Sequence, residues 1–510
     1  AAVFTCKGKP AVQRCHRTKE GSCALRGIVD PLPGIRVEQM VLAAADRKCG
    51  RGAVLPWQNQ RIAGLAAVGQ NGSCQFVDRE ELRIGRFFDR AGDGLGGAAL
   101  AWLLSRDLFG GSGLLAEELS PQGQLVYDVT PKKPPNRPRA KAVIQLFMQG
   151  GPSQMDLLDP KPKLAELHGE EYFDKVAADL TGPEQAGKLF RSPWRFRHYG
   201  ESGLQVSELM PHLGTVADEL AVVRSMHTTH PNHEPAIFKY QSGRLIQGLP
   251  SFGSWVVYGL GTENQNLPAF VALAAEGSLP VNGAQNWHNG LLPPVYQGTP
   301  LRTQGAPLLN LSREVAQPTG ALTVERDLLK RLDRIHRRRR PGHLQLDARI
   351  ASYNLAARMQ LEASEALDLS RESRETLDAY GVGNNKTDNY ARRCVMARRL
   401  VERGVRFVQI STQRQIWDNH SGIVEGLKNC CGRTDQPIAA LLKDLRQRGL
   451  LEDTLVVWGG EFGRMPIAQL PDRRNLSAAG RDHNPRGFTV WLAGGGVKAG
   501  SIYGATDELG

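Results

Sequence analysis

The chain has 510 residues and carries 64 Lys and Arg against 52 Asp and Glu, a formal net charge of +12. Its 41% hydrophobic and 23% charged residues are typical of a globular protein and exclude a disordered, collagen-like or coiled-coil chain. One dense basic run occupies residues 337–340, but no nucleic-acid-binding motif accompanies it. We therefore expect a solvated helix end there and no nucleic-acid partner.

The N-terminal part lacks the periodicity of a folded domain. Residues 1–75 show no clear helical or strand pattern, and we expect a poorly structured or misassigned extension. Residues 76–110 resemble a degraded twin-arginine export signal, because arginines precede an apolar run at 94–104, although Arg79 is followed by Glu80. This segment predicts export to the periplasm or cell envelope. The apolar run is shorter than the roughly 20 residues that cross a membrane, so we expect no transmembrane span.

A folded domain is expected over residues 141–510, after a linker over 111–140 that ends in a Pro-, Lys- and Arg-rich stretch. Apolar runs predict strands at 142–148, 219–223, 405–410, 454–458 and 488–492. Helical patterns cover 345–378, 387–403 and 436–448. Their alternation predicts an α/β fold whose mostly parallel central sheet has helices on both faces.

Histidines and carboxylates follow the predicted strands, at the sheet edge where such folds bind ligands. The candidate site residues are Ser153, Asp156, Asp159, His230, His233, Asp418, His420, Glu461, Arg464, Asp482 and His483. Imidazoles with carboxylates suit Zn or Mn, and oxygen ligands suit Ca, so the pattern predicts a divalent metal of open identity. Alternatives remain for single residues: Glu461 either binds metal or caps a helix, and Arg464 either pairs with Glu461 or holds an anionic ester.

Five ordered motifs carry a family resemblance. They begin at Gln149 (QGGPSQMDLLDPKP), Met226 (MHTTHPNHEP), Trp417 (WDNH), Trp458 (WGGEFGRMP) and Gly480 (GRDHNP). From about residue 140 onward the chain resembles the domain-of-unknown-function family fifteen-oh-one, a sulfatase-like family grouped with the alkaline phosphatase superfamily. The resemblance implies an alkaline-phosphatase-like fold and metal-dependent hydrolysis of sulfate or phosphate esters.

The resemblance also implies roles for the candidate residues. It assigns the metal to Asp156 (with Asp159 as its rival), Asp418, His420, Glu461 and His483, and it leaves His230 and Asp482 as further candidates. His233 falls in the slot of the sulfatase nucleophile, where it is either a ligand or an unusual nucleophile. Ser153 is the other candidate near the ester, and Arg464 would stabilise developing negative charge. Phe462 stands where the superfamily has a histidine, which leaves a second metal open.

The sequence is therefore consistent with two functions. The first is an exported hydrolase whose substrate is an anionic ester, with a sulfated polysaccharide as one candidate. The second is a catalytically inactive descendant that binds a sulfated or phosphorylated polymer, or a protein partner, through the same cleft. The final residues resemble the stretch just before the family's last strand and helix, so we expect a C-terminal truncation.

Overall fold

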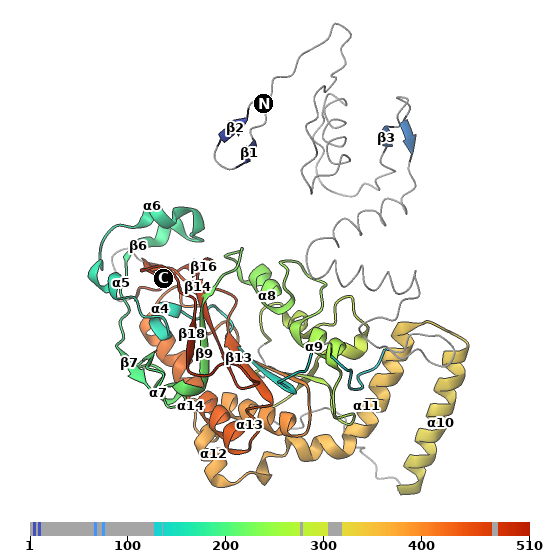
Figure 1. The fold of residues 1–510 in the computed structure, drawn as a ribbon. Helices are drawn as coiled ribbons and strands as arrows, with labels where there is room; N and C mark the ends of the chain where they lie inside the picture. The colour runs from blue at the N-terminus through green and yellow to red at the C-terminus, as the bar shows by residue number, and fades with distance from the viewer. Residues whose placement is uncertain are drawn as a thin grey trace. The chain divides into compact units, whose positions relative to one another are not determined.

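The computed structural model describes residues 127–134, 136–275, 279–303, 319–471 and 478–510, together with four short strands nearer the N-terminus (Figure 1). Those strands pair antiparallel, β1 Phe4–Cys6 with β2 Lys9–Ala11 and β3 Ala66–Val68 with β4 Cys74–Phe76. The rest of the expected extension, and the signal-like segment after Phe76, lie outside the described residues. In the part that is described, no helix combines the length and apolar character needed to cross a membrane.

An eight-stranded sheet forms the centre of the unit that spans residues 113–510. In spatial order its strands are β11 Thr299–Leu301, β10 Phe270–Leu273, β12 Phe407–Ser411, β5 Ala142–Phe147, β13 Thr454–Gly459, β17 Phe488–Ala493, β9 Leu220–Met226 and β18 Ser501–Tyr503. All neighbouring strands are parallel except in the two pairs that β17 makes, with β13 and with β9. The predicted α/β fold with a mostly parallel sheet is confirmed.

Helices cover both faces of this sheet. On β5, Ile144 and Leu146 belong to the core that includes α13 Asp388–Glu402 and α14 Ile423–Gln447. Val143 belongs instead to a second core with α9 Phe252–Leu260. A strand that is buried on both faces is apolar at most positions rather than at alternate ones. This explains why β5 could be predicted from its apolar residues, although it also contains the buried Gln145, which accepts from Gln409 of β12.

The predicted helices differ from the observed ones at their boundaries. The predicted helix 345–378 is split into α11 Leu344–Leu367, the single turn η6 Leu369–Arg371 and α12 Arg374–Tyr380. The side chain of Asp368 accepts from the Ser370 N–H, and that of Ser373 accepts from the Thr376 N–H, so each turn begins with its own cap. The predicted helix 436–448 corresponds to only the second half of α14. The observed helix begins at Ile423 and continues through Pro437, a residue that usually marks a helix start.

Short helices and two-stranded ladders connect the main strands. The ladders pair β6 Ala186–Leu189 with β15 Ile467–Gln469, β7 Phe196–Tyr199 with β8 Leu204–Ser207, and β14 Gly463–Arg464 with β16 His483–Asn484. The helices are α4 Gln154–Leu157, α5 Pro162–Glu166, α6 Phe173–Val176, α7 Pro211–Gly214, α8 His233–Ser242 and α10 Thr319–Arg338. Single turns are η1 Ala177–Asp179, η2 Pro183–Gln185, η3 Ala217–Glu219, η4 Gly283–Trp287 and η5 Pro294–Tyr296.

A buried ion network joins the helices on one side of the sheet. Arg398 and Arg399 of α13 both contact the Glu372 carboxylate, and Arg398 also lies 2.9 Å from Asp444 of α14. Burial by itself would raise the pKa of Glu372, but hydrogen bonds and charge from the two guanidinium groups hold that pKa below its ordinary value. Glu372 is therefore the shared counter-charge of two buried arginines.

Replacing Glu372 by alanine should destabilise the protein by about 3 kcal/mol or more, because it leaves two buried guanidinium groups short of a counter-charge. Urea unfolding measures this loss. A depressed folded-state pKa means that the carboxylate stabilises the fold above its unfolded pKa near 4.5 and loses this effect as the pH falls through the folded value. The difference between wild type and E372A should therefore shrink in acid.

The matched control is Asp378→Ala, which breaks the exposed pair of Arg374 and Asp378 within α12. An exposed pair of this kind contributes less than about 1 kcal/mol, so D378A should unfold close to wild type at every pH. Equal losses in the control and in E372A would contradict the role given to Glu372.

Candidate metal centre

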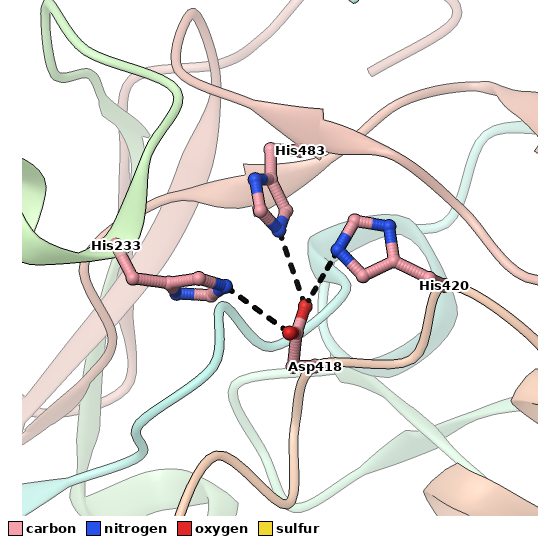
Figure 2. A group of neighbouring side chains, drawn as sticks. All are labelled: His233, Asp418, His420 and His483. Atoms are coloured by element: carbon pink, nitrogen blue, oxygen red, sulfur yellow. Dashed lines mark hydrogen bonds and ion pairs between the residues drawn. The ribbon is translucent and has the colours of Figure 1, made fainter. Parts of the chain in front are cut away.

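Four side chains converge at one edge of the main sheet. One ligand atom from each of His233, Asp418, His420 and His483 lies within 4.8 Å of all the others, and Figure 2 shows three imidazoles directed at one carboxylate. The Nε2 atoms of His233, His420 and His483 lie 3.2, 3.0 and 3.1 Å from the Asp418 oxygens. We call these four residues the His/Asp group.

Strand direction explains why residues so distant in sequence meet. Asp418 and His420 lie in the loop after β12, and His233 is the first residue of α8, in the connection after β9. His483 lies in β16, directly before β17. Because β17 runs opposite to β9 and β12, its amino end lies at the edge where they have their carboxyl ends. This is the edge at which ligands bind in sheets of this type.

The far nitrogen of each histidine is held by an oxygen that can only accept a hydrogen bond. The pairs are His233 Nδ1 with Glu461 Oε1 at 2.7 Å, His420 Nδ1 with Gln469 Oε1 at 2.6 Å, and His483 Nδ1 with the Pro231 carbonyl at 2.7 Å. An imidazole that donates from Nδ1 presents the lone pair of Nε2 when it is neutral. The outer contacts therefore favour the tautomer that binds metals through Nε2.

The donor set fits a divalent cation. Lone pairs of neutral imidazoles repel a carboxylate unless a proton or a cation lies between them. The Nε2 atom of His233 is buried, and the polar atom that it faces is Asp418 Oδ2 at 3.2 Å. The three Nε2 atoms lie 3.0–3.2 Å from the Asp418 oxygens, close to the spacing of ligands that each lie about 2.0–2.2 Å from one ion, and all four ligand atoms lie within 4.8 Å of one another. The His/Asp group thus has the chemistry and the spacing of a metal site.

The metal-free site holds unlike charges. Burial would raise the pKa of Asp418, yet hydrogen bonds from the three histidines and the charge of Arg464 hold it far below its ordinary value. Burial opposes charge on His233 too, but its bonds to Asp418 and Glu461 raise its pKa to about 9. Burial lowers the pKa of His483 to about 4, so that imidazole is neutral near pH 7.

Arg464 and Gly150 fix the position of Asp418. The buried Arg464 guanidinium donates to Asp418 Oδ1 at 2.6 Å and to the Gly151 carbonyl at 2.9 Å. A Cβ on Gly150 would lie 2.5 Å from the Asp418 nitrogen, and the Gly150 φ of +114° also disfavours any other residue. The Gly150 N–H donates to Glu461 Oε1, so the loop after β5 is bonded to the same carboxylate that holds His233.

Seven of the eleven predicted residues lie outside the His/Asp group, and three of them, Ser153, Asp156 and Asp159, have their interactions elsewhere. Asp156 is fully buried and pairs with Arg481 at 2.8 Å, and it also accepts from Ser153 Oγ at 2.5 Å. Asp159 lies 3.0 Å from Lys161 and 3.4 Å from Arg224. Both carboxylates therefore have protein cations as partners. The motif around Gly480 contained Arg481, but nothing in the sequence indicated its pairing with Asp156.

Of the remaining candidates, Glu461 and Asp482 lie beside histidines of the group, whereas His230 contacts the backbone of Asn232. Glu461 holds His233, as described. Asp482 accepts from the backbone N–H groups of Thr181 and Gly182, and its Oδ1 lies 4.0 Å from His420 Nδ1. The Nδ1 atom of His230 accepts from the Asn232 N–H. Sequence reasoning missed Gln469 and the Pro231 carbonyl as outer partners, because an amide and a backbone oxygen give no pattern that distinguishes this role.

Together, the fold and this site define an α/β protein with a histidine- and aspartate-lined site at the ligand-binding edge of its sheet. Residues 140–510 match the family described as "Protein of unknown function (DUF1501)", and the chain belongs to that family. The expected resemblance is thereby confirmed. No curated protein matches the sequence.

Solved structures with similar folds are distant. The alkaline phosphatase of the Antarctic bacterium TAB5 has a TM-score of 0.31 at 11% identity, with 72% of this chain and 95% of that chain covered. The PsFucS1 sulfatase from Pseudoalteromonas sp. has 0.28 at 14% identity, covering 73% and 66%. The lipoteichoic acid synthase LtaP from Listeria monocytogenes has 0.30 at 9%, covering 71% and 68%. At these scores no functional weight rests on the likeness.

Removing a member of the His/Asp group should abolish metal binding. Asp418→Asn removes the negative charge of the site and His483→Ala deletes a ligand nitrogen, and we expect affinity for Zn²⁺ or Mn²⁺ to fall by more than the roughly 10–100-fold that loss of an outer partner costs. Elemental analysis of protein loaded and then desalted gives the metal content. His198→Ala, an exposed histidine bonded to the Gly203 carbonyl, is the control and should keep wild-type content. Undiminished metal in D418N would contradict the assignment.

Glu461 should act as the positioning partner of His233. Glu461→Ala frees the His233 ring and should weaken metal affinity about 10–100-fold, whereas Glu461→Gln keeps an acceptor oxygen and should lose less. Competition with a fluorescent chelator measures both affinities. Equal affinity of E461A and wild type would show that the contact between Glu461 and His233 does not orient the ring.

Proposed function

We propose that this protein is a metal-dependent hydrolase of sulfate or phosphate esters that acts after export to the cell envelope. One observation carries the proposal: three imidazole Nε2 atoms face one carboxylate, while each Nδ1 contacts an acceptor oxygen. The family resemblance of the five motifs agrees with it. Export rests on the signal-like segment at 76–110 alone.

The proposed metal is Zn²⁺ or Mn²⁺. His233, Asp418, His420 and His483 would hold it, and three imidazoles with one carboxylate suit these ions better than Ca²⁺, which prefers oxygen ligands. When bound, such an ion supplies Lewis acidity and lowers the pKa of a bound water. Because imidazole nitrogens dominate the donor set, Ca²⁺ is the least suited of the three metals considered from the sequence.

The four side chains of the group differ in their exposure to solvent. The side chains of His420 and Asp418 are 33% and 22% exposed, whereas those of His233 and His483 are 12% and 7% exposed. A substrate would therefore approach past His420. His233 opens α8, and the side chain of its N-cap residue Asn232 makes no capping hydrogen bond. The positive end of that helix beside the group favours an anionic ester.

Water is the proposed nucleophile, because the four side chains of the His/Asp group include no hydroxyl or thiol. Ser153, the hydroxyl considered from the sequence, is only 1% exposed and donates to Asp156. Arg464 donates to Asp418 and to backbone carbonyls, so we assign it the task of holding Asp418 rather than of contacting the ester. The geometry favours His233 as a ligand over His233 as a nucleophile.

The test uses protein stripped with a chelator and reloaded with Zn²⁺ or Mn²⁺. Release of p-nitrophenol from its sulfate or phosphate ester should appear on reloading, should be absent in D418N and should be retained in H198A. Activity that survives stripping, or that is equal in D418N, would contradict the proposal. Metal retention without turnover of either ester would favour the alternative, a protein that only binds anionic polymers or a partner through this site.

A further inference from the structure

Helix α10 carries an exposed apolar stripe. Val324, Leu328, Leu332 and Ile335 are 70%, 55%, 52% and 47% exposed. Their spacing of four, four and three residues places them along one face of the helix. Scattered exposed apolar residues are ordinary on protein surfaces, but a continuous stripe marks an interaction site.

Among the described residues, helix α11 holds α10 by a different face. The Arg326 guanidinium donates to the Ala357 carbonyl of α11 at 3.1 Å, and Arg337 lies 2.6 Å from Asp347 of α11. Figure 1 shows the two helices side by side. At about 100° per residue, Arg326, Asp333 and Arg337 share one side of the helix, and the stripe lies on the other. Helix α11 therefore leaves the stripe uncovered.

The surroundings of the stripe are strongly basic. Residues 319–340 contain eight lysines and arginines against three acidic residues, a net charge of +5. Arg331, Arg334 and Arg338 follow one border of the stripe and are exposed, as are Arg339 and Arg340 beyond the helix end. The basic run at 337–340, which the hydrolase proposal leaves without a role, continues this surface.

We propose that α10 docks on a membrane surface that carries anionic lipid headgroups. An amphipathic helix with an apolar stripe and a Lys/Arg-rich polar face lies in the interface plane, with its stripe at the boundary of the acyl chains and its cations near lipid phosphates. A second copy of the chain fits less well, because it would bring together two segments that each carry a net charge of +5. This inference does not depend on the hydrolase proposal.

The experiment is flotation of the full chain with vesicles of phosphatidylcholine alone, or with about 30% phosphatidylglycerol, a content chosen to give a negative surface potential. Binding is expected only with the anionic lipid and should weaken as salt is raised. The variant Leu328→Ser/Leu332→Ser/Ile335→Ser should bind at least about tenfold more weakly. The control Leu279→Ser/Leu291→Ser changes two leucines that are each 65% exposed elsewhere, and it should bind as wild type does.

Failure to float with anionic vesicles would overturn the proposal, and so would equal binding of the triple variant and the control. A wild-type dimer that the triple substitution converts to a monomer, seen by light scattering, would instead assign the stripe to an interface between copies. The triple variant should keep the metal content and circular dichroism of wild type, which separates lost docking from lost folding.

Discussion

The site depends on one contact: the Asp418 carboxylate, held among three imidazoles and the buried Arg464 guanidinium. Burial alone would raise the pKa of this partly buried carboxylate, but its neighbours favour the charged form and depress the pKa strongly. The imidazoles are fixed in turn by oxygens behind them. A site that gathers three imidazoles around one carboxylate suits a cation, which would replace the proton that His233 holds there, and the hydrolase proposal follows from that preference.

The fold produces this contact through strand direction and close backbone approach. Parallel strands bring the loops after β9, β12 and β13 to one edge, and the reversed β17 adds His483 from its amino end. Gly150 lets the loop after β5 approach the Asp418 backbone, with which a Cβ at this position would collide. Gly150 is therefore part of the site, although it contributes no side chain.

Much of the fold was predictable, because apolar runs mark strands that are buried on both faces, as in β5 and β12. The site was predictable in kind, since Asp418, His420 and His483 follow or precede such strands. The sequence did not predict which cation pairs with a given carboxylate. Asp156 pairs with Arg481, 325 residues later, and no local sequence pattern indicates a contact at that separation. Helix breaks at Asp368 and Ser373 were missed because side-chain capping competes with an otherwise helical pattern.

The most direct test is anomalous diffraction at the zinc or manganese absorption edge from crystals of loaded protein. We expect a single strong peak among the Nε2 atoms of His233, His420 and His483, with an Asp418 oxygen among the ligands. A peak held instead by Asp156 and Asp159, or no peak from protein loaded with either metal, would contradict it.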